Sequence, residues 1–171
     1  MRKLTLALIA TVAAAGLTSA ASAADLLIDQ TPTPIVDNSY SGFDWNGAYA
    51  GISLSGQTGS IYGLGADLGV NALIDNNLLV GAEGNVTWLN DDSWQGQVHG
   101  KLGFASGNFA FYGLLGVGYN TESEAYAPIG VGAELALTDS MSLKAEYQYQ
   151  YDFNDSSEDA SVAKVGLNWH F

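Results

Sequence analysis

Charged side chains of both signs recur at alternate positions along this chain, among small and amide residues. The lysines are Lys101, Lys144 and Lys164, and the acids on the same polar faces are Asp67, Glu83, Glu134 and Glu146. A charge that is removed from water costs several kcal/mol unless it pairs and hydrogen-bonds with an opposite charge. The sequence therefore predicts that these seven residues form a closed network of ion pairs.

Two histidines, His99 and His170, lie on the same polar faces. A structural hydrogen-bonding role is favoured for both, and a proton or ion path through the two rings is the alternative. Nucleophilic hydrolysis needs a serine and a histidine within hydrogen-bond reach and an orienting carboxylate. Ser142 is assigned to the far end of its strand from His170, so no such pair is expected. We predict no catalytic residue, no metal ligand and no cofactor, and we do not expect an enzyme.

The elements that carry these residues follow a period of two from Trp45 to the end of the chain, which is typical of β-strands. Eight strands are predicted: 47–56, 60–73, 77–89, 93–105, 108–120, 125–138, 140–152 and 160–171. Short stretches of Gly, Asn, Asp and Ser, which suit tight turns, separate them. Connections this short join antiparallel strands, because parallel strands need long crossovers.

The two faces of each predicted strand differ sharply. In 140–152 the odd positions from Met141 onward are apolar or aromatic, and the even positions from Ser142 to Asp152 are polar. The polar faces are otherwise rich in Gly, Ala, Ser, Gln and Asn, which fit the narrow interior of an eight-stranded barrel. We therefore predict an all-β fold, an eight-stranded antiparallel up-and-down transmembrane β-barrel. The alternative is a soluble lipocalin-like barrel, which needs the opposite orientation of the side chains.

Aromatic residues gather near the ends of the predicted strands, where a membrane barrel carries its interfacial girdles. The residues assigned to these girdles are Trp45, Trp88, Trp94, Tyr119, Tyr126, Tyr151, Trp169 and Phe171.

The N-terminus reads as an export signal. Arg2 and Lys3 precede a short apolar run, and Ala21-Ser22-Ala23 is a small-x-small cleavage site. We predict a signal peptide over 1–23, a periplasmic linker over 24–44 and an outer-membrane barrel over 45–171.

Composition narrows the classes of partner. The 171 residues include no Cys and carry a net charge of −13, which becomes −15 once Arg2 and Lys3 leave with the signal peptide. Disulfides and cysteine-ligated zinc are excluded, and nucleic acid is a poor partner for so acidic a chain. We interpret the remaining acids as residues of solvated turns. The alternative is that they bind divalent cations that bridge to anionic lipid head groups. The acids of the expected outward loops are Asp91, Asp92, Glu122, Glu124, Asp152, Asp155, Glu158 and Asp159.

Two motifs carry a family resemblance. The segment Asp44-Trp45-Asn46-Gly47-Ala48-Tyr49-Ala50-Gly51 resembles the opening of the small, porin-like outer-membrane β-barrel proteins of α-proteobacteria. The ending, with alternating apolar residues up to Trp169 and Phe171, is similar to the signal that the barrel assembly machinery reads. The resemblance implies an eight-stranded outer-membrane barrel with a porin-like or surface-antigen role. The loops of this chain are unusually short, which argues against adhesion.

Together these observations predict an outer-membrane barrel with a structural role in the envelope and a lumen plugged by ion pairs. A small porin that passes ions or small solutes is the alternative. The expected partners are outer-membrane lipids and lipopolysaccharide, with the barrel assembly machinery during biogenesis.

Overall fold

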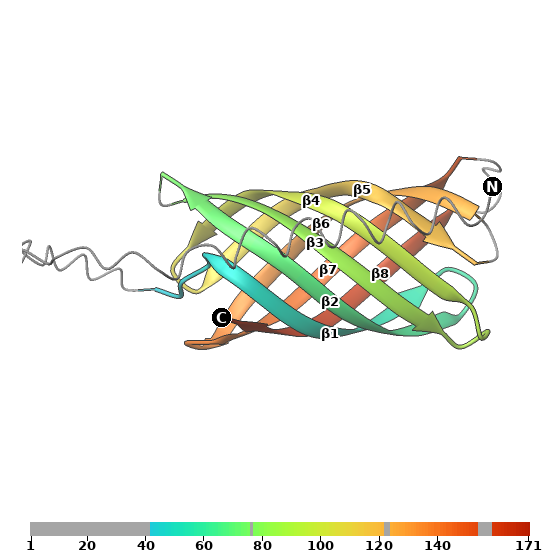
Figure 1. Ribbon diagram of the computed structural model, residues 1–171, viewed down its shortest axis with the longest axis horizontal. Coiled ribbons are helices and arrows are strands. Elements are labelled where there is room, and N and C mark those ends of the chain that lie inside the picture. The colour runs from blue at the N-terminus through green and yellow to red at the C-terminus, as the bar shows by residue number, and fades with distance from the viewer. Residues whose placement is uncertain (1–41, 76, 122–123, 154–158) are drawn as a thin grey trace, which may run out of the picture. The chain divides into compact units, whose positions relative to one another are not determined.

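A computed structural model describes residues 42–75, 77–121, 124–153 and 159–171 (Figure 1). The described residues form eight strands: β1 (Gly47–Gln57), β2 (Ile61–Ile74), β3 (Leu78–Leu89), β4 (Trp94–Ser106), β5 (Phe109–Asn120), β6 (Glu124–Thr138), β7 (Met141–Asp152) and β8 (Ala160–His170). No helix in the described part of the chain has the length and apolar character needed to cross a membrane. The predicted signal peptide and residues 24–41 of the predicted linker lie outside the described residues.

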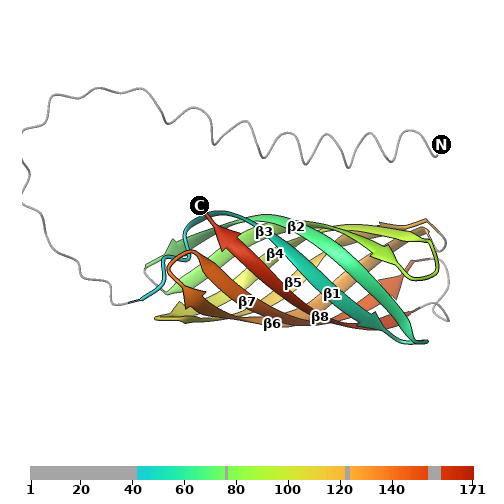
Figure 2. The same ribbon diagram turned by 90° about the horizontal axis from the view of Figure 1, so that it is seen from below.

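The strands form one closed antiparallel barrel in sequence order, which confirms the predicted fold class. Each strand pairs with its neighbours in the chain, and β1 closes the barrel against β8, with Tyr49 opposite His170 and Gln57 opposite Val162. Figure 2 shows β1 and β8 side by side and all strands running obliquely around the barrel. Closure leaves no unpaired strand edge, which is what a β-structure needs in order to cross a bilayer.

Alternation along each strand separates two kinds of surface. In β7, every even-numbered residue from Ser142 to Asp152 is buried, and Leu143 to Tyr151 are exposed at the odd positions. Large apolar side chains cover the outside, with Leu54 65% and Phe104 66% exposed. Such a surface would be unfavourable in water and suits lipid. The alternative of a soluble barrel, which needs its apolar side chains inside, is therefore wrong.

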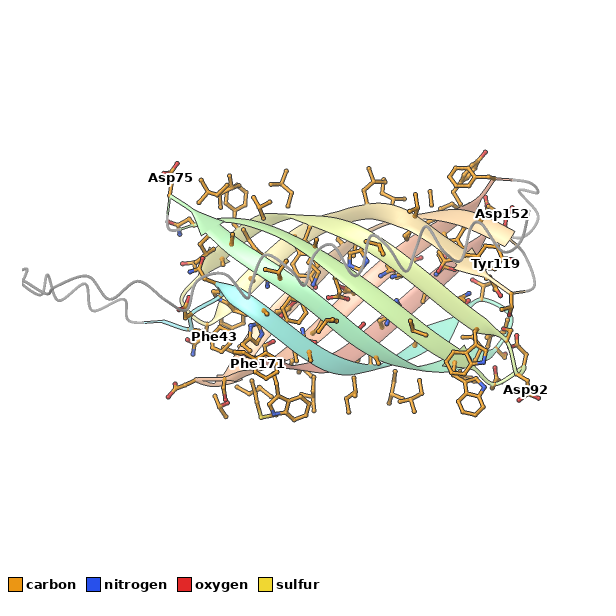
Figure 3. The ribbon with its side chains drawn as sticks, in the orientation of Figure 1. Phe43, Asp75, Asp92, Tyr119, Asp152 and Phe171 are labelled. Atoms are coloured by element: carbon orange, nitrogen blue, oxygen red, sulfur yellow. The ribbon has the colours of Figure 1, made fainter. Side chains whose placement is uncertain are left out.

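The barrel has two distinct ends. The terminal end carries the start of β1, the end of β8 and the short β2–β3, β4–β5 and β6–β7 turns, and the loop end carries the other four connections. In Figure 3, Phe43, Asp75 and Phe171 lie at the terminal end, and Asp92, Tyr119 and Asp152 lie at the loop end. Gly107 has a φ of 57° in the β4–β5 turn, a conformation that glycine adopts without strain.

Candidate functional site: the barrel lumen

Glu83 of β3 lies at the centre of the lumen and is 1% exposed. Its Oε2 accepts hydrogen bonds from Lys101 Nζ at 2.7 Å and from the Tyr49 hydroxyl at 2.6 Å. Its Oε1 accepts from Lys144 Nζ at 2.6 Å. Charge-assisted hydrogen bonds this short are the strong class, so one carboxylate holds groups from β1, β4 and β7 together.

Lys101 joins this centre to two further acids. Its Nζ lies 3.3 Å from Glu134 Oε1 and 3.9 Å from Glu146 Oε1. It also lies 4.5 Å from the centroid of the Tyr112 ring, which is within the range of a cation–π interaction. Because Lys101 is surrounded by three carboxylates and an aromatic face, protein groups compensate its charge.

Glycines on the neighbouring strands make room for the inward tyrosines. Tyr49 is directly opposite Gly69, and Tyr112 is directly opposite Gly132. A Cβ on either glycine would lie 2.3–2.4 Å from the tyrosine ring, so the ring lies against the wall where a side chain would stand. This placement allows the Tyr112 hydroxyl to donate to Glu146 Oε1 at 2.7 Å.

Lys164 contacts the network through an amide. Its Nζ donates to Asn85 Oδ1 at 3.1 Å, and Asn85 Nδ2 donates to Asp67 Oδ1 at 2.6 Å. Lys144 Nζ lies 3.5 Å from the same Asp67 oxygen. No ion pair within 4.0 Å links Lys164 to an acid of the described residues, so a direct pair between Lys164 and Glu146 is not formed.

All seven charged residues predicted for the lumen lie inside it, and each is 5% exposed or less. Three lysines face four acids, so the cluster has a formal net charge of −1. Inward tyrosine, serine and amide groups donate to the acids and stabilise the surplus negative charge.

His99 is buried beside the central carboxylate. Its Nε2 lies 3.8 Å from Glu83 Oε1, and its Nδ1 lies 3.5 Å from Gln97 Nε2. His99, Glu83 and Glu146 each have one ligand atom within 4.8 Å of those of the other two, which is close enough for a metal site. Lys101 and Lys144 already occupy both oxygens of Glu83, and their charges would repel a cation. This donor set does not fit a resident metal.

His170 and Ser142 are adjacent, and the predicted separation of the two is wrong. Ser142 Oγ lies 3.0 Å from His170 Nε2 and donates to Glu134 Oε2 at 3.0 Å. In an antiparallel pair the start of β7 meets the end of β8, which is why the two residues share the terminal end.

This Ser–His–Glu arrangement differs from that of a hydrolase. The carboxylate engages the serine hydroxyl, and His170 Nδ1, where an orienting acid would bind, has no partner among the described residues. Ser142 is fully buried, and the imidazole of His170 stacks on Tyr49 at 5.3 Å. Among the described residues, the imidazole therefore lacks the orienting carboxylate that activation of a serine by a histidine needs.

Residues before β1 close the terminal end. Phe43 and Trp45 are 5% and 1% exposed and pack edge to face at 4.6 Å inside the mouth. Trp45 Nε1 donates to Gly107 O at 3.1 Å. Phe43 falls within the predicted linker, yet it is part of the buried apolar cluster with Leu79 and Tyr112. We call Phe43 and Trp45 the cork.

The girdle prediction is therefore wrong for Trp45, and it is also wrong for Tyr126. Tyr126 is 3% exposed, and its hydroxyl donates to Gln97 Oε1 at 3.3 Å inside the barrel. Both residues lie near strand ends, and position along the barrel axis does not reveal which face of the strand a side chain occupies. Five of the other predicted girdle residues are 41–82% exposed, namely Trp88, Trp94, Tyr151, Trp169 and Phe171, and Tyr119 is half-buried.

Amide side chains fill the lumen between the central charges and the loop end. Gln97 Nε2 donates to Gln148 Oε1 at 3.2 Å, and Gln57 Nε2 donates to Gln95 Oε1 at 3.0 Å. Above them a hollow of about 340 Å³ opens at the loop end. Neither these amides nor the inward Tyr49 and Tyr112 are among the residues predicted for the lumen. Their position on the polar face of each strand was the available signal.

The acids of the outward loops are only partly described. Ser93 donates to Asp91 Oδ1 through its hydroxyl at 2.6 Å and through its backbone N–H at 3.0 Å. These bonds hold the pKa of the Asp91 carboxyl below its usual value. Glu122, Asp155, Glu158 and the side chain of Glu124 lie outside the described residues.

Comparison with known proteins places this geometry among outer-membrane barrels. The family described as "Outer membrane protein beta-barrel domain" matches residues 10–171. No curated protein matches the sequence.

Similar solved structures share the fold at low sequence identity. The N-terminal β-barrel domain of OprF from Pseudomonas aeruginosa is 14% identical at a TM-score of 0.54, with 74% of this chain and 98% of that chain covered. The Yersinia pestis outer membrane protein Ail is 14% identical at a TM-score of 0.53, with 74% and 99% covered. The outer membrane enzyme PagL is 10% identical at a TM-score of 0.56, with 72% and 99% covered.

Proposed function

The chain belongs to the outer membrane protein β-barrel domain family, and on that premise we propose that it is a structural component of the bacterial envelope whose lumen is closed to solutes. One observation carries the proposal. Glu83, Lys101 and Lys144 meet in the middle of the lumen at 2.6–2.7 Å, and each is at most 2% exposed. A solute would have to break these bonds and leave charges unpaired, which is strongly unfavourable.

The cork supports the same conclusion independently. Phe43 and Trp45 fill the terminal mouth with apolar side chains, so an ion would lose its hydration there as well. The lumen is therefore closed at two levels that use different physical effects.

The orientation in the membrane is part of the proposal. The described turns at the terminal end are short, whereas residues 153–159 connect β7 to β8 at the loop end. Outer-membrane barrels have short periplasmic turns and longer outer loops, so we place the terminal end in the periplasm. Export through a signal peptide cleaved after Ala23 belongs to this proposal, as does the α-proteobacterial affiliation that the Asp44–Gly51 motif suggests.

The partners follow from the outer surface. The exposed apolar side chains would contact lipid and the acyl chains of lipopolysaccharide, with Trp88 and Trp94 stacked at 5.3 Å near the loop end. Trp169 and Phe171 face outward at the end of the chain, 41% and 82% exposed, where the barrel assembly machinery could reach them. We propose no enzymatic activity, cofactor or metal.

Single-channel conductance in planar bilayers tests the closed lumen. The folded mature chain should give no steady conductance. Lys101→Met should give a cation-selective leak, because three acids then face one another without a shared cation. Lys164→Met is the matched control and should stay closed, since Lys164 Nζ contacts an amide. Regular ohmic steps from the unmodified protein would overturn the proposal.

A small porin is the second candidate, and the unfilled hydrogen-bonding capacity of the lumen favours it. Buried atoms of Asn71, His99 and Asn168 have no partner among the described residues. Polar sites of this kind commonly hold ordered water, and a continuous file of water would carry ions. The same conductance measurement decides between the two candidates.

A further inference from the structure

The hollow at the loop end has the size of a ligand site and a mainly polar lining. Its volume of about 340 Å³ is within the range of small-molecule sites. Carboxylates and amides supply most of its polar groups, from Asp91, Asp152, Asp159, Gln57, Gln95 and Gln150. These residues come from strands and loops far apart in the sequence, and the closed barrel brings them together.

No lysine of the described residues lines this hollow. Lys164 of β8 is the lysine with the fewest residues between it and the loop end, and its Nζ donates to Asn85 Oδ1. Lys101 and Lys144 are bound to Glu83 in the central cluster. The hollow therefore presents three acids in a wall to which no lysine contributes, and such a wall attracts cations.

Gln150 points to a missing ligand. It is 4% exposed, it lines the hollow, and its Nε2 has no hydrogen-bond partner among the described residues. A buried amide without a partner is unfavourable by about 1–3 kcal/mol, so the site has unused hydrogen-bonding capacity. Because the two ends of an amide exchange by a 180° turn, Gln150 can also offer its oxygen to a donor.

Two of the three carboxylates of the hollow are held in place by hydrogen bonds. Asp159 Oδ1 accepts the backbone N–H of Asp152 at 2.9 Å, and its Oδ2 accepts the Tyr149 hydroxyl at 2.7 Å. In the β3–β4 loop, the Ser93 hydroxyl donates to Asp91 Oδ1, which fixes this carboxylate and favours its ionised form. Fixed carboxylates bind without a large loss of conformational entropy.

Their spacing does not suit one metal ion bound by all three carboxylates. Among the described residues, the one group of three acidic or histidine side chains whose ligand atoms lie within 4.8 Å of one another is Glu83, His99 and Glu146, deep in the lumen. Asp91, Asp152 and Asp159 do not converge in this way. A flexible cation with several separated charges would reach them, and Ile61 and Leu89, which also line the hollow, would contact its methylene groups.

We propose that the loop-end hollow binds a linear aliphatic polyamine, with its ammonium groups paired to Asp91, Asp152 and Asp159 and its chain lying beside Gln150. This site lies outside the central cluster, so it does not depend on whether the lumen conducts. Ammonium groups are hydrogen-bond donors only, which matches a lining of carboxylate and amide oxygens.

Isothermal titration of the folded mature chain in detergent tests this site, with spermidine as the probe. We expect saturable 1:1 binding. The double variant Asp91→Asn with Asp152→Asn should weaken it at least tenfold. Asp75→Asn with Asp139→Asn, which removes the same charge from turns at the terminal end, should change it less than twofold.

Any one of four results would overturn the proposal. Binding that is not saturable, or that both double variants weaken equally, would reduce the effect to general attraction by an acidic protein. Displacement of spermidine by Mg²⁺ at equal concentration would make the site a metal site. Should the double variant fail to give the heat-modifiable band of a folded barrel, Asp91→Asn alone serves, because the new amide keeps an oxygen for the Ser93 donors. That variant should then weaken binding at least threefold, and an unchanged affinity would equally overturn the proposal.

Discussion

Replacing Glu83 by Gln is the sharpest test of the central cluster. The substitution keeps the size of the side chain and removes the charge that Lys101 and Lys144 share. Taking one partner away from a buried ion pair costs about 3–5 kcal/mol, because the remaining charges stay buried without compensation. With an m value of about 2 kcal/mol/M, a loss of about 4 kcal/mol lowers the urea midpoint by about 2 M.

The matched control is Asp67→Asn in the same lumen. Asp67 lies 3.5 Å from Lys144 Nζ and accepts its short hydrogen bond from Asn85, which an asparagine oxygen can still accept. We expect a loss of about 1 kcal/mol. Equilibrium urea unfolding in phospholipid vesicles, followed by tryptophan fluorescence, measures both variants.

A double-mutant cycle isolates the pair. Glu83→Gln combined with Lys101→Met should cost at least about 1 kcal/mol less than the sum of the two single changes, because neither charge of the pair is then left buried without the other. The argument that Glu83 holds the cluster together would be refuted if the urea midpoints of Glu83→Gln and Asp67→Asn differed by less than about 0.5 M.

Three further perturbations probe other parts of the barrel. Trp45→Ala should lower the free energy of unfolding by about 3–5 kcal/mol, measured by urea titration, because it leaves a cavity in the cork. Gly130→Ala should abolish the heat-modifiable gel band, since its Cβ would lie 2.2 Å from a backbone oxygen, whereas Gly113→Ala has 3.9 Å of space and should fold. Ser93→Ala should raise the pKa of Asp91 toward its ordinary value in an NMR titration, because both the hydroxyl donor and part of the ordered geometry are lost.

Each of these has a contrary result. A Trp45→Ala barrel as stable as the parent would show that the cork does not contribute to folding. Equal folding yields for the two glycine variants would contradict the steric argument.

The pKa of Asp91 is lowered in the folded state. Its contribution to stability is therefore present at neutral pH and is lost as the pH falls through that pKa. An unchanged Asp91 titration in Ser93→Ala would remove Ser93 as the cause.

The sequence determined the number, order and faces of the strands. A period of two within each of the eight strands, together with short polar turns, leaves few alternatives to an antiparallel meander. Alternation also places Glu83, Lys101 and Lys144 on the polar faces of their strands. A shift by one residue would exchange the two faces of a strand, so the pattern specifies the face. These features depend on neighbours along the chain, so a single sequence contains them.

Closure of the barrel decided the contacts across the lumen. Glu83 accepts from Lys144, 61 residues away, and Ser142 meets His170 because β7 and β8 are antiparallel. Near the strand ends alternation no longer fixed the face, which is why Trp45 was expected in a girdle and is found in the cork. Pairing across a closed barrel depends on register, tilt and the space that each glycine leaves, and these are properties of the tertiary structure.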